Sequence, residues 1–352
     1  MIQIDTARLL RSLAEMAKIG ATKKGGVCRL AATIEDKSAR DLFTSWAKKE
    51  HCEISVDQIG NIFARRPGKN NKLPPVVLGS HLDSQPTGGK YDGAYGVIAA
   101  LEVIRCLNDN SIETARPIEA VSWTNEEGSR FPPAMMGSGV FSGAIDLEKA
   151  LETRDSNGIS VREALTEIGY AGDRSCGNRP IHTYLEAHIE QGPILEQENT
   201  TIGAVLGIQG IRWFDIVVEG KEAHAGPTPM SAREDALVGA ANLMLEIENI
   251  ALRHLPDGRT TVGTMDVFPN SRNVIPGQIT LGVDMRHPEE DVLSTMATEL
   301  RSMFQAMCKR RGTTGNVSEI WYSPPTLFDA ETVSTIEEMA QMRQFSCRRI
   351  TS

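Results

Sequence analysis

The sequence lacks the features of membrane, secreted and nucleic-acid-binding proteins. No run of about eighteen apolar residues occurs and charges interrupt the apolar N-terminus, so neither a membrane span nor a signal peptide is expected. Acidic residues outnumber basic ones by 46 to 37, and the net charge of −9 disfavours nucleic acid and anionic membranes as partners. Six cysteines lie far apart with no C-x-x-C pair, which excludes a zinc ribbon and indicates buried thiols in a reducing compartment. We therefore expect a cytoplasmic protein with a small-molecule partner.

The hydrophobic pattern divides the 352 residues into two parts near residue 209. In the first part we expect helices at 5–20, 37–50 and 95–108, and strands at 61–65, 75–80, 117–123 and 183–187. The order of strand, helix and strand around 95–108 predicts a βαβ crossover. In the second part we expect strands at 212–220, 260–268, 278–286 and 317–322, and helices at 231–252 and 290–310. The second part therefore has the βαββαβ order of ferredoxin-like domains.

The fold class predicted from these elements is α/β. We expect a mixed, largely parallel sheet with helices on both faces, formed by residues 1–208 and 326–352. The ferredoxin-like domain, residues 209–325, is expected to be inserted into this first domain.

Polar side chains with metal-binding chemistry follow the predicted strands of the first domain. They are His81 and Asp83, then Asp92 in a glycine-rich loop, then Glu126 and Glu127, and finally His188. In open α/β sheets this is the edge at which ligands bind. Each group alone has an ordinary explanation, a surface hydrogen bond for the histidine and aspartate pair and a solvated helix start for the two glutamates. Together, His81, Asp92, Glu127 and His188 make the mixed nitrogen and oxygen set that suits zinc or manganese.

The two adjacent glutamates can have different roles. One can bind a metal ion while its neighbour moves a proton between an attacking water and a leaving nitrogen. Alternatively, Glu126 caps a helix. The residues alone leave both interpretations open.

Five segments in this order carry a resemblance to a known family. They are GSHLDSQPTGGKYDGAYG (79–96), WTNEEGSRF (123–131), HIEQGPILE (188–196), HAGPTPM (224–230) and NVIPG (273–277). The chain resembles the amidase, or hydantoinase and carbamoylase, branch of the M20 metallopeptidase superfamily over nearly its whole length. This branch includes N-carbamoyl-L-amino-acid hydrolases, β-ureidopropionases, and allantoate or ureidoglycolate amidohydrolases.

The resemblance implies a dinuclear metal site in the first domain. Two divalent ions per subunit, Zn²⁺ or else Mn²⁺, Co²⁺ or Ni²⁺, are bridged by Asp92. His81 and His188 are implied as ligands of one ion and Glu127 as a ligand of the other. Glu126 becomes the general base and acid, and Asp83 becomes the carboxylate behind His81.

The resemblance also implies a role for the ferredoxin-like domain as a lid and as the surface of a homodimer. His224, which otherwise reads as a buried or capping histidine, becomes a stabiliser of the oxyanion. Gln191, Asn273 and Arg286 are implied to bind the substrate, with the guanidinium on the substrate carboxylate. Arg286 alone would be read as a surface arginine.

The activity implied by the resemblance is metal-dependent hydrolysis of a linear amide or ureido C–N bond that is not a peptide bond. The substrate we favour is an N-carbamoyl-L-amino acid, which gives the amino acid, CO₂ and NH₃. The alternatives are a β-ureidopropionase, an allantoate or ureidoglycolate amidohydrolase, a dipeptidase or aminoacylase, and an inactive relative.

The last expectation concerns the C-terminal end of the sequence. Members of the family supply a final histidine after the inserted domain, whereas no histidine follows His287 here. We therefore expect a truncated chain that binds at most one metal tightly, through His81, Asp92 and His188, and has little or no activity. The alternative is a complete enzyme that takes its missing ligand from water or from a partner chain.

Overall fold

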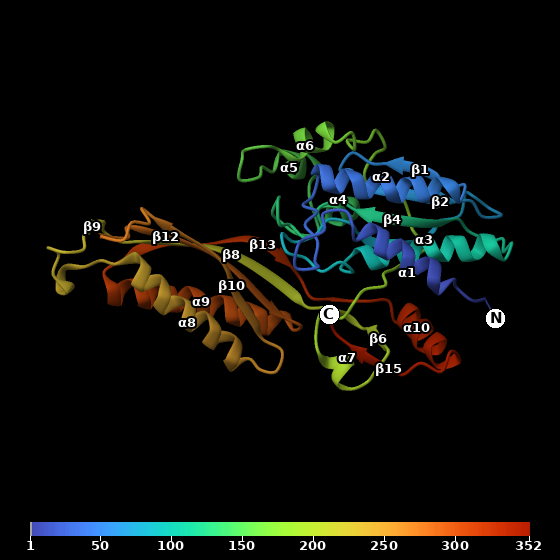
Figure 1. Cartoon of the computed structure of the whole chain (residues 1–352). Coiled ribbons are helices and arrows are strands. Elements are labelled where there is room, and N and C mark those ends of the chain that lie inside the picture. The colour runs from blue at the N-terminus through green and yellow to red at the C-terminus, as the bar shows by residue number, and fades with distance from the viewer. Residues whose placement is uncertain (1) are drawn as a thin grey trace. The chain divides into compact units, whose positions relative to one another are not determined.

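A computed structural model describes residues 2–352, and the chain forms two compact units with their boundary between Gln191 and Gly192. Figure 1 shows the helices and strands of both units. Within the described residues, every helix is too short or too polar to cross a membrane. All six cysteines are free thiols. Cys52 and Cys106 are buried and the other four are half-buried, so the expectation of buried thiols is met by only two of them.

In its described residues, 2–191, the first unit holds one five-stranded mixed sheet and six helices. The helices are α1 (Thr6–Met16), α2 (Ile34–Lys49), α3 (Ala94–Asp109), α4 (Met136–Ser142), α5 (Leu147–Glu152) and α6 (Val161–Glu167). The strands are β1 (Glu53–Val56), β2 (Ile62–Arg66), β3 (Val76–His81), β4 (Ile118–Trp123) and β5 (Thr183–Leu185). Their order in the sheet is β1-β2-β4-β3-β5.

Strand β3 pairs in parallel with both β4 and β5, while β1, β2 and β4 pair antiparallel. Helix α3 connects β3 to β4, which is the crossover predicted from the sequence (Figure 1). Because β3, β4 and β5 run in the same direction, the residues that follow them leave the sheet at one edge.

The main core of the first unit lies between the helices and one face of the sheet. Alternating residues of β2 and β4, such as Ile62, Ala64 and Ala120, face this cluster together with Phe43 of α2 and Leu101 of α3. The opposite face carries a smaller cluster of four residues, against which Phe141 of α4 packs: Phe63, Val77, Val121 and Trp123. The period of two along each strand thus sends neighbouring side chains into different clusters.

The second unit contains the predicted βαββαβ arrangement. Its strands are β8 (Gly210–Glu219), β10 (Arg259–Phe268), β12 (Gln278–His287) and β13 (Thr314–Ser323), and its helices are α8 (Ala236–Arg253) and α9 (Glu290–Arg311). The strands form an antiparallel sheet in the order β10-β12-β8-β13. The two helices pack on one face of it, over an apolar core that includes Phe214, Leu243, Leu281 and Leu300.

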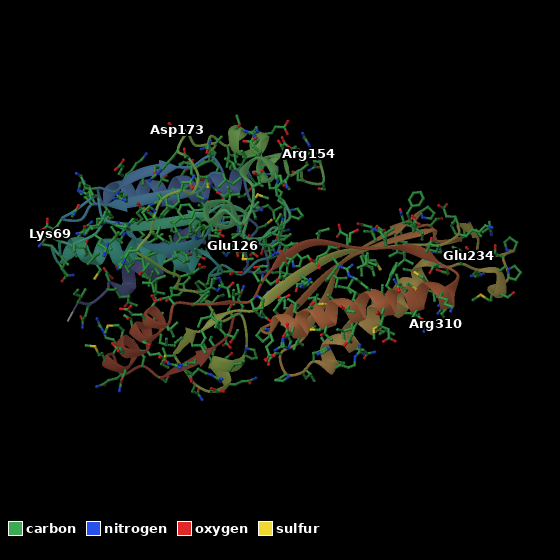
Figure 2. All side chains as sticks on the ribbon, turned by 180° about the vertical axis from the view of Figure 1, so that it is seen from behind. Lys69, Glu126, Arg154, Asp173, Glu234 and Arg310 are labelled. Atoms are coloured by element: carbon green, nitrogen blue, oxygen red, sulfur yellow. The ribbon has the colours of Figure 1, made fainter. Side chains whose placement is uncertain are left out.

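Helix α8 begins later than the sequence pattern suggested. The pattern placed its start at residue 231, whereas Met230–Ala232 form a separate 3-10 turn and Asp235 is the N-cap, accepting a hydrogen bond from the Val238 amide. An aspartate N-cap satisfies an amide that the first helical turn leaves unpaired. Figure 2 shows Glu234, just before α8, and Arg310, in the last turn of α9, at the same end of this unit.

Short elements complete the second unit. They are α7 (Ile194–Gln197), β6 (Ile202–Val205), β7 (Gly207–Ile208), β9 (Ala223–His224), β11 (Val274–Ile275), β14 (Thr326–Leu327), α10 (Ala330–Met342) and β15 (Cys347–Ile350). Strand β15 pairs with β6, β14 pairs with β7, and β11 pairs with β9. These pairings hold residues 192–208 and 326–352 to each other within the second unit, so their assignment to the first domain stays a prediction.

Candidate metal centre

The ends of three neighbouring parallel strands bring the predicted ligands of the first unit together. His81 is the last residue of β3, Glu126 and Glu127 follow β4, and His188 follows β5. Asp92 lies in the loop between β3 and α3. Figure 2 shows the Glu126 side chain on this unit.

Three of these residues form a compact donor set. One ligand atom each from His81, Asp92 and His188 lies within 4.8 Å of the others. The Asp92 Oδ1 atom is 3.1 Å from His188 Nε2 and 3.9 Å from His81 Nε2. Two imidazoles and a carboxylate that converge on one point are a donor set suited to zinc and to related divalent ions.

Both imidazole rings are oriented by backbone carbonyl groups. The Nδ1 atom of His81 lies 2.9 Å from the Asp83 carbonyl oxygen, and Nδ1 of His188 lies 2.8 Å from the Ile189 carbonyl oxygen. A carbonyl only accepts, so each Nδ1 carries a proton and Nε2, the atom that faces Asp92, is left as the atom that can bind a metal ion once it has lost its own proton. This is the orientation that a metal-binding histidine requires, and the residues present therefore fit a divalent ion.

The position directly after Asp92 requires a glycine, Gly93. Its φ is +60°, and a Cβ atom built there would lie 2.4 Å from the His81 ring. Any other residue would be strained and would displace the imidazole.

The Asp83 carboxylate, which the resemblance places behind His81, hydrogen-bonds the turn after β4. It accepts hydrogen bonds at 3.2 Å from the amides of both Glu126 and Glu127, while its Oδ1 is 3.9 Å from His81 Nδ1. The carbonyl of Asp83, rather than its carboxylate, contacts His81. Asn125, at a left-handed φ of +50°, makes the turn that aims the two amides at this carboxylate.

Glu126 lies beside the donor set without belonging to it. Its Oε2 atom is 3.5 Å from His81 Nε2. Burial raises the pKa of Glu126 to about 7, with His81 opposing the shift and the carboxylates of Asp83 and Glu127 adding to it. A carboxyl group whose pKa is near neutrality can both take up and release a proton at physiological pH.

Glu127 is held apart from the three donors by Gln85. The Gln85 side-chain amide donates to Glu127 Oε2 at 2.8 Å, and its backbone amide donates to Oε1 at 3.2 Å. Ser129 donates in turn to the Gln85 side-chain oxygen. Sequence reasoning missed Gln85 as a partner of Glu127, because nothing in the local pattern Ser84-Gln85-Pro86 indicates a contact with the loop after β4.

Gln191 contacts the donor set directly. Its side-chain amide donates to Asp92 Oδ2 at 2.6 Å. The sequence assigned Gln191 to the substrate, and the structure places its amide on the carboxylate predicted to bridge the metals.

The charges of the donor set support one another in the absence of a metal. The hydrogen bond to Asp92 raises the pKa of His188 to about 9, against the effect of burial. Burial works against the charge of Asp92, but His188 and His81 outweigh it and lower the pKa of Asp92. A metal ion binding here therefore replaces a proton on His188.

His224 is the last residue of β9, and Asn273 directly precedes β11, the strand that pairs with β9, so the two lie close together in the second unit. The Ala225 amide donates to the Asn273 carbonyl at 2.9 Å, and the Gly226 amide donates to His224 Nδ1 at 3.1 Å. Since Nδ1 accepts, the proton of the neutral ring is on Nε2, which is exposed and can donate. This tautomer suits the predicted stabilisation of an oxyanion.

Arg286 lies in β12 of the four-stranded sheet, a different sheet from the two-stranded one formed by β9 and β11. Arg286 lies eight residues along β12 from Gln278, which corresponds to about 27 Å of extended strand. Strand β11 ends three residues before Gln278, so Asn273 lies toward that end of β12. The Arg286 guanidinium makes two hydrogen bonds to Asp284, at 2.8 and 2.9 Å, and Trp213 donates to the same carboxylate. Within one chain, the structure therefore does not bring Arg286 together with His224 and Asn273.

Comparisons with known proteins agree with the resemblance seen in the five motifs. Residues 77–351 match the model of peptidase family M20/M25/M40. The chain is 41% identical to the N-carbamoyl-L-amino-acid amidohydrolase of Rhizobium meliloti, over 99% of this chain and 84% of that protein. It is 34% identical to the allantoate amidohydrolase of Bacillus subtilis, over 96% of this chain and 82% of that protein.

A solved structure gives the same result for the fold. The amidase of the hydantoinase/carbamoylase family from Burkholderia vietnamiensis superposes with a TM-score of 0.98 at 52% identity, covering 100% of this chain and 85% of that one. The expected mixed α/β architecture is confirmed by this likeness. The chain belongs to the peptidase M20/M25/M40 family and is similar, within it, to amidases of the hydantoinase/carbamoylase type.

Proposed function

We propose that this protein is a metal-dependent hydrolase of a linear amide or ureido C–N bond that is not a peptide bond. The observation that carries this proposal is the convergence of His81, Asp92 and His188 beside a glutamate whose pKa is near 7. The names of relatives that cover nearly the whole chain, carbamoyl-amino-acid and allantoate amidohydrolases, support the ureido substrate class.

We assign His81, Asp92 and His188 as the residues that hold a divalent ion, with Glu127 as the further carboxylate available to a second ion. A bound divalent ion supplies Lewis-acid polarisation of the substrate carbonyl and lowers the pKa of water. Zinc and manganese both suit this donor set, as do cobalt and nickel. Since Glu127 is engaged by Gln85, one tightly bound ion per chain is the occupancy we expect.

Glu126 is the proposed general base and acid. It takes a proton from the attacking water and returns it to the leaving nitrogen. Asp83 fixes the position of Glu126 by binding its amide, so that the carboxylate stays next to His81. His224 is proposed to donate its Nε2 proton to the developing oxyanion.

The favoured substrate is an N-carbamoyl-L-amino acid. Water adds to the ureido carbon and the C–N bonds break, giving the amino acid, CO₂ and NH₃. Arg286 is proposed to bind the substrate carboxylate, because a guanidinium matches a carboxylate with two parallel hydrogen bonds. Gln191 and Asn273 are proposed as further polar contacts.

A homodimer through the ferredoxin-like domain is part of the proposal. Arg286 lies about 27 Å along β12 from Gln278, the end of the strand that is nearer in sequence to Asn273, whereas an N-carbamoyl amino acid is far shorter. If all three residues serve one active site, a second copy must supply one of the two groups. Six free thiols support a cytoplasmic location.

The test is a substrate panel assayed with the full chain and each divalent ion in turn. N-carbamoyl-L-amino acids, N-carbamoyl-β-alanine, allantoate, ureidoglycolate, N-acetyl amino acids and dipeptides are compared for release of ammonia or of amine. We expect ammonia from N-carbamoyl-L-amino acids, and we expect Glu126→Gln to keep its metal but lose turnover. Turnover of allantoate alone would overturn the favoured substrate, and amine release alone would indicate an aminoacylase or dipeptidase.

A further inference from the structure

Glu186 links three strands of the first unit through a chain of side-chain hydrogen bonds. Trp123 Nε1 donates to the Tyr184 hydroxyl at 3.0 Å, and that hydroxyl donates to Glu186 Oε2 at 2.5 Å. The Ser80 hydroxyl donates to Glu186 Oε1 at 2.5 Å. One carboxylate therefore joins β3, through Ser80, to β5, and Tyr184 extends the connection to β4.

Three of these hydrogen-bonded residues lie one to three positions before a candidate site residue. Ser80 precedes His81 by one position, Trp123 precedes Glu126 by three, and Glu186 precedes His188 by two. These hydrogen bonds therefore join the strands close to the points where the candidate site residues follow them.

The backbone ladder alone does not fix the segment that carries His188. The pairing of β3 with β5 ends at Leu78 and Leu185, three residues before either strand's histidine. By contrast, the pairing of β3 with β4 continues to His81 itself, opposite Trp123. The bond from Ser80 to Glu186 thus extends the contact between β3 and β5 beyond the end of the ladder.

Both hydroxyl groups donate to Glu186 at 2.5 Å, and the Tyr184 hydroxyl lies farther, 3.3 Å, from its other acceptor, the Gly79 carbonyl of β3. Ser80 is fully buried. Burial, together with the charge of Glu186 and the hydrogen bond to it, raises the pKa of Tyr184 well above 10, so its hydroxyl keeps the proton that it donates. A carboxylate only accepts, and both oxygens of Glu186 are occupied in this way. Glu186 is thus engaged with the strands rather than aimed at the donor set, which consists of His81, Asp92 and His188.

We propose that Glu186 is a positioning residue that anchors the segment after β5 to β3 and so holds His188 in register with His81 and Asp92. The inference rests on the proposed metal site, and it extends it to a residue that contacts neither metal nor substrate. Partners of this kind tune a metal site because they fix the directions of its ligands.

The experiment measures Co²⁺ binding to the full chain, by competition with a chelator and by the visible absorption of the bound ion. Glu186→Ala is expected to weaken Co²⁺ binding by about 10- to 100-fold and to change the absorption spectrum of the ion that still binds. Tyr184→Phe and Ser80→Ala each remove one hydroxyl and are expected to weaken binding less. Glu53→Gln, a change at an exposed glutamate on β1, is the matched control and should bind as the wild type does.

Two results would overturn the inference. One is wild-type Co²⁺ affinity and an unchanged spectrum in Glu186→Ala, even if its melting temperature falls, because that pattern indicates a role in stability alone. If Glu186→Ala does not fold, wild-type binding and spectra in both Tyr184→Phe and Ser80→Ala overturn it instead. Failure of the proposed function gives a different result. In that case the wild type binds Co²⁺ at the site that contains His81 but hydrolyses none of the substrates in the panel.

Discussion

The pH dependence of metal binding gives the sharpest test of the candidate site. In the metal-free protein the hydrogen bond to Asp92 raises the pKa of His188 from the ordinary 6.5 to about 9. A metal ion can use His188 Nε2 only after its proton has left. Metal affinity should therefore rise with pH until the ring of the metal-free protein is neutral.

The size of the effect follows from the distance between pH 7 and this pKa. A group with a pKa of about 9 is neutral in roughly one molecule per hundred at pH 7 and in about half of the molecules at pH 9, so the gain in affinity between these pH values is about fiftyfold. The His188 side chain is 31% exposed, and water screens its pairing with Asp92, so we take about tenfold as the lower bound. Neighbouring carboxylates outweigh burial and raise the pKa of His81 as well, which makes the rise steeper.

The assay is competition between the full chain and a chelator for Co²⁺, from pH 6.5 to 8.5, with the proton affinity of the chelator taken into account. His254, which pairs with Glu299 in the second unit, supplies the control variant His254→Asn, whose slope should match the wild type. An affinity that is flat between pH 7 and pH 8.5 refutes the reasoning, as does an NMR titration of His188 centred at 6.5. The ion pair between His188 and Asp92 also stabilises the metal-free fold. This contribution is complete below about pH 6.5 and is lost as the pH rises through about 9.

Four further predictions concern the site and the core. Gly93→Ala places a Cβ atom against His81 at a positive φ, so we expect it to lower metal affinity and to cost roughly 1–3 kcal/mol in the free energy of unfolding, measured by denaturant titration. Arg286→Lys keeps the charge but loses the planar fork, and kcat/KM for carboxylate substrates should fall by about 1.5–3 kcal/mol in transition-state binding; an unchanged value refutes the assignment. Leu101→Ala, in the core under α3, should cost about 2–5 kcal/mol in stability and leave the metal content per folded chain unchanged, as measured by elemental analysis. Because a general base must be ionised, kcat/KM should rise with pH through about 7 as Glu126 loses its proton, and a profile flat from pH 5.5 to 8.5 would contradict that role.

The long elements could be predicted from the sequence because their hydrophobic period is strong. The helix expected at 290–310 is Glu290–Arg311, and the strand expected at 278–286 is Gln278–His287. Helices α4, α5 and α6 were not predicted, since each has only six or seven residues and presents less than two full turns of the pattern. The start of α8 was placed too early, at residue 231, because Met230–Ala232 form a separate 3-10 turn and the helix begins only after the Asp235 cap.

The ligand residues could be identified from motifs and strand ends, but their hydrogen-bond partners could not. The contact between Gln85 and Glu127 joins residues 42 positions apart, and no local periodicity carries that information. The same holds for the Asp83 carboxylate, which binds the amides of the turn after β4 instead of His81. The distance between Arg286 and His224 became apparent only from the register of the strands.

The position of the donor set along the chain has a consequence for synthesis. His81, Asp92 and His188 all belong to the compact unit that ends at Gln191. N-terminal units generally fold first as a chain leaves the ribosome. All three proposed ligands are therefore synthesised before any residue of the ferredoxin-like domain, so the donor set does not depend on that domain being made first.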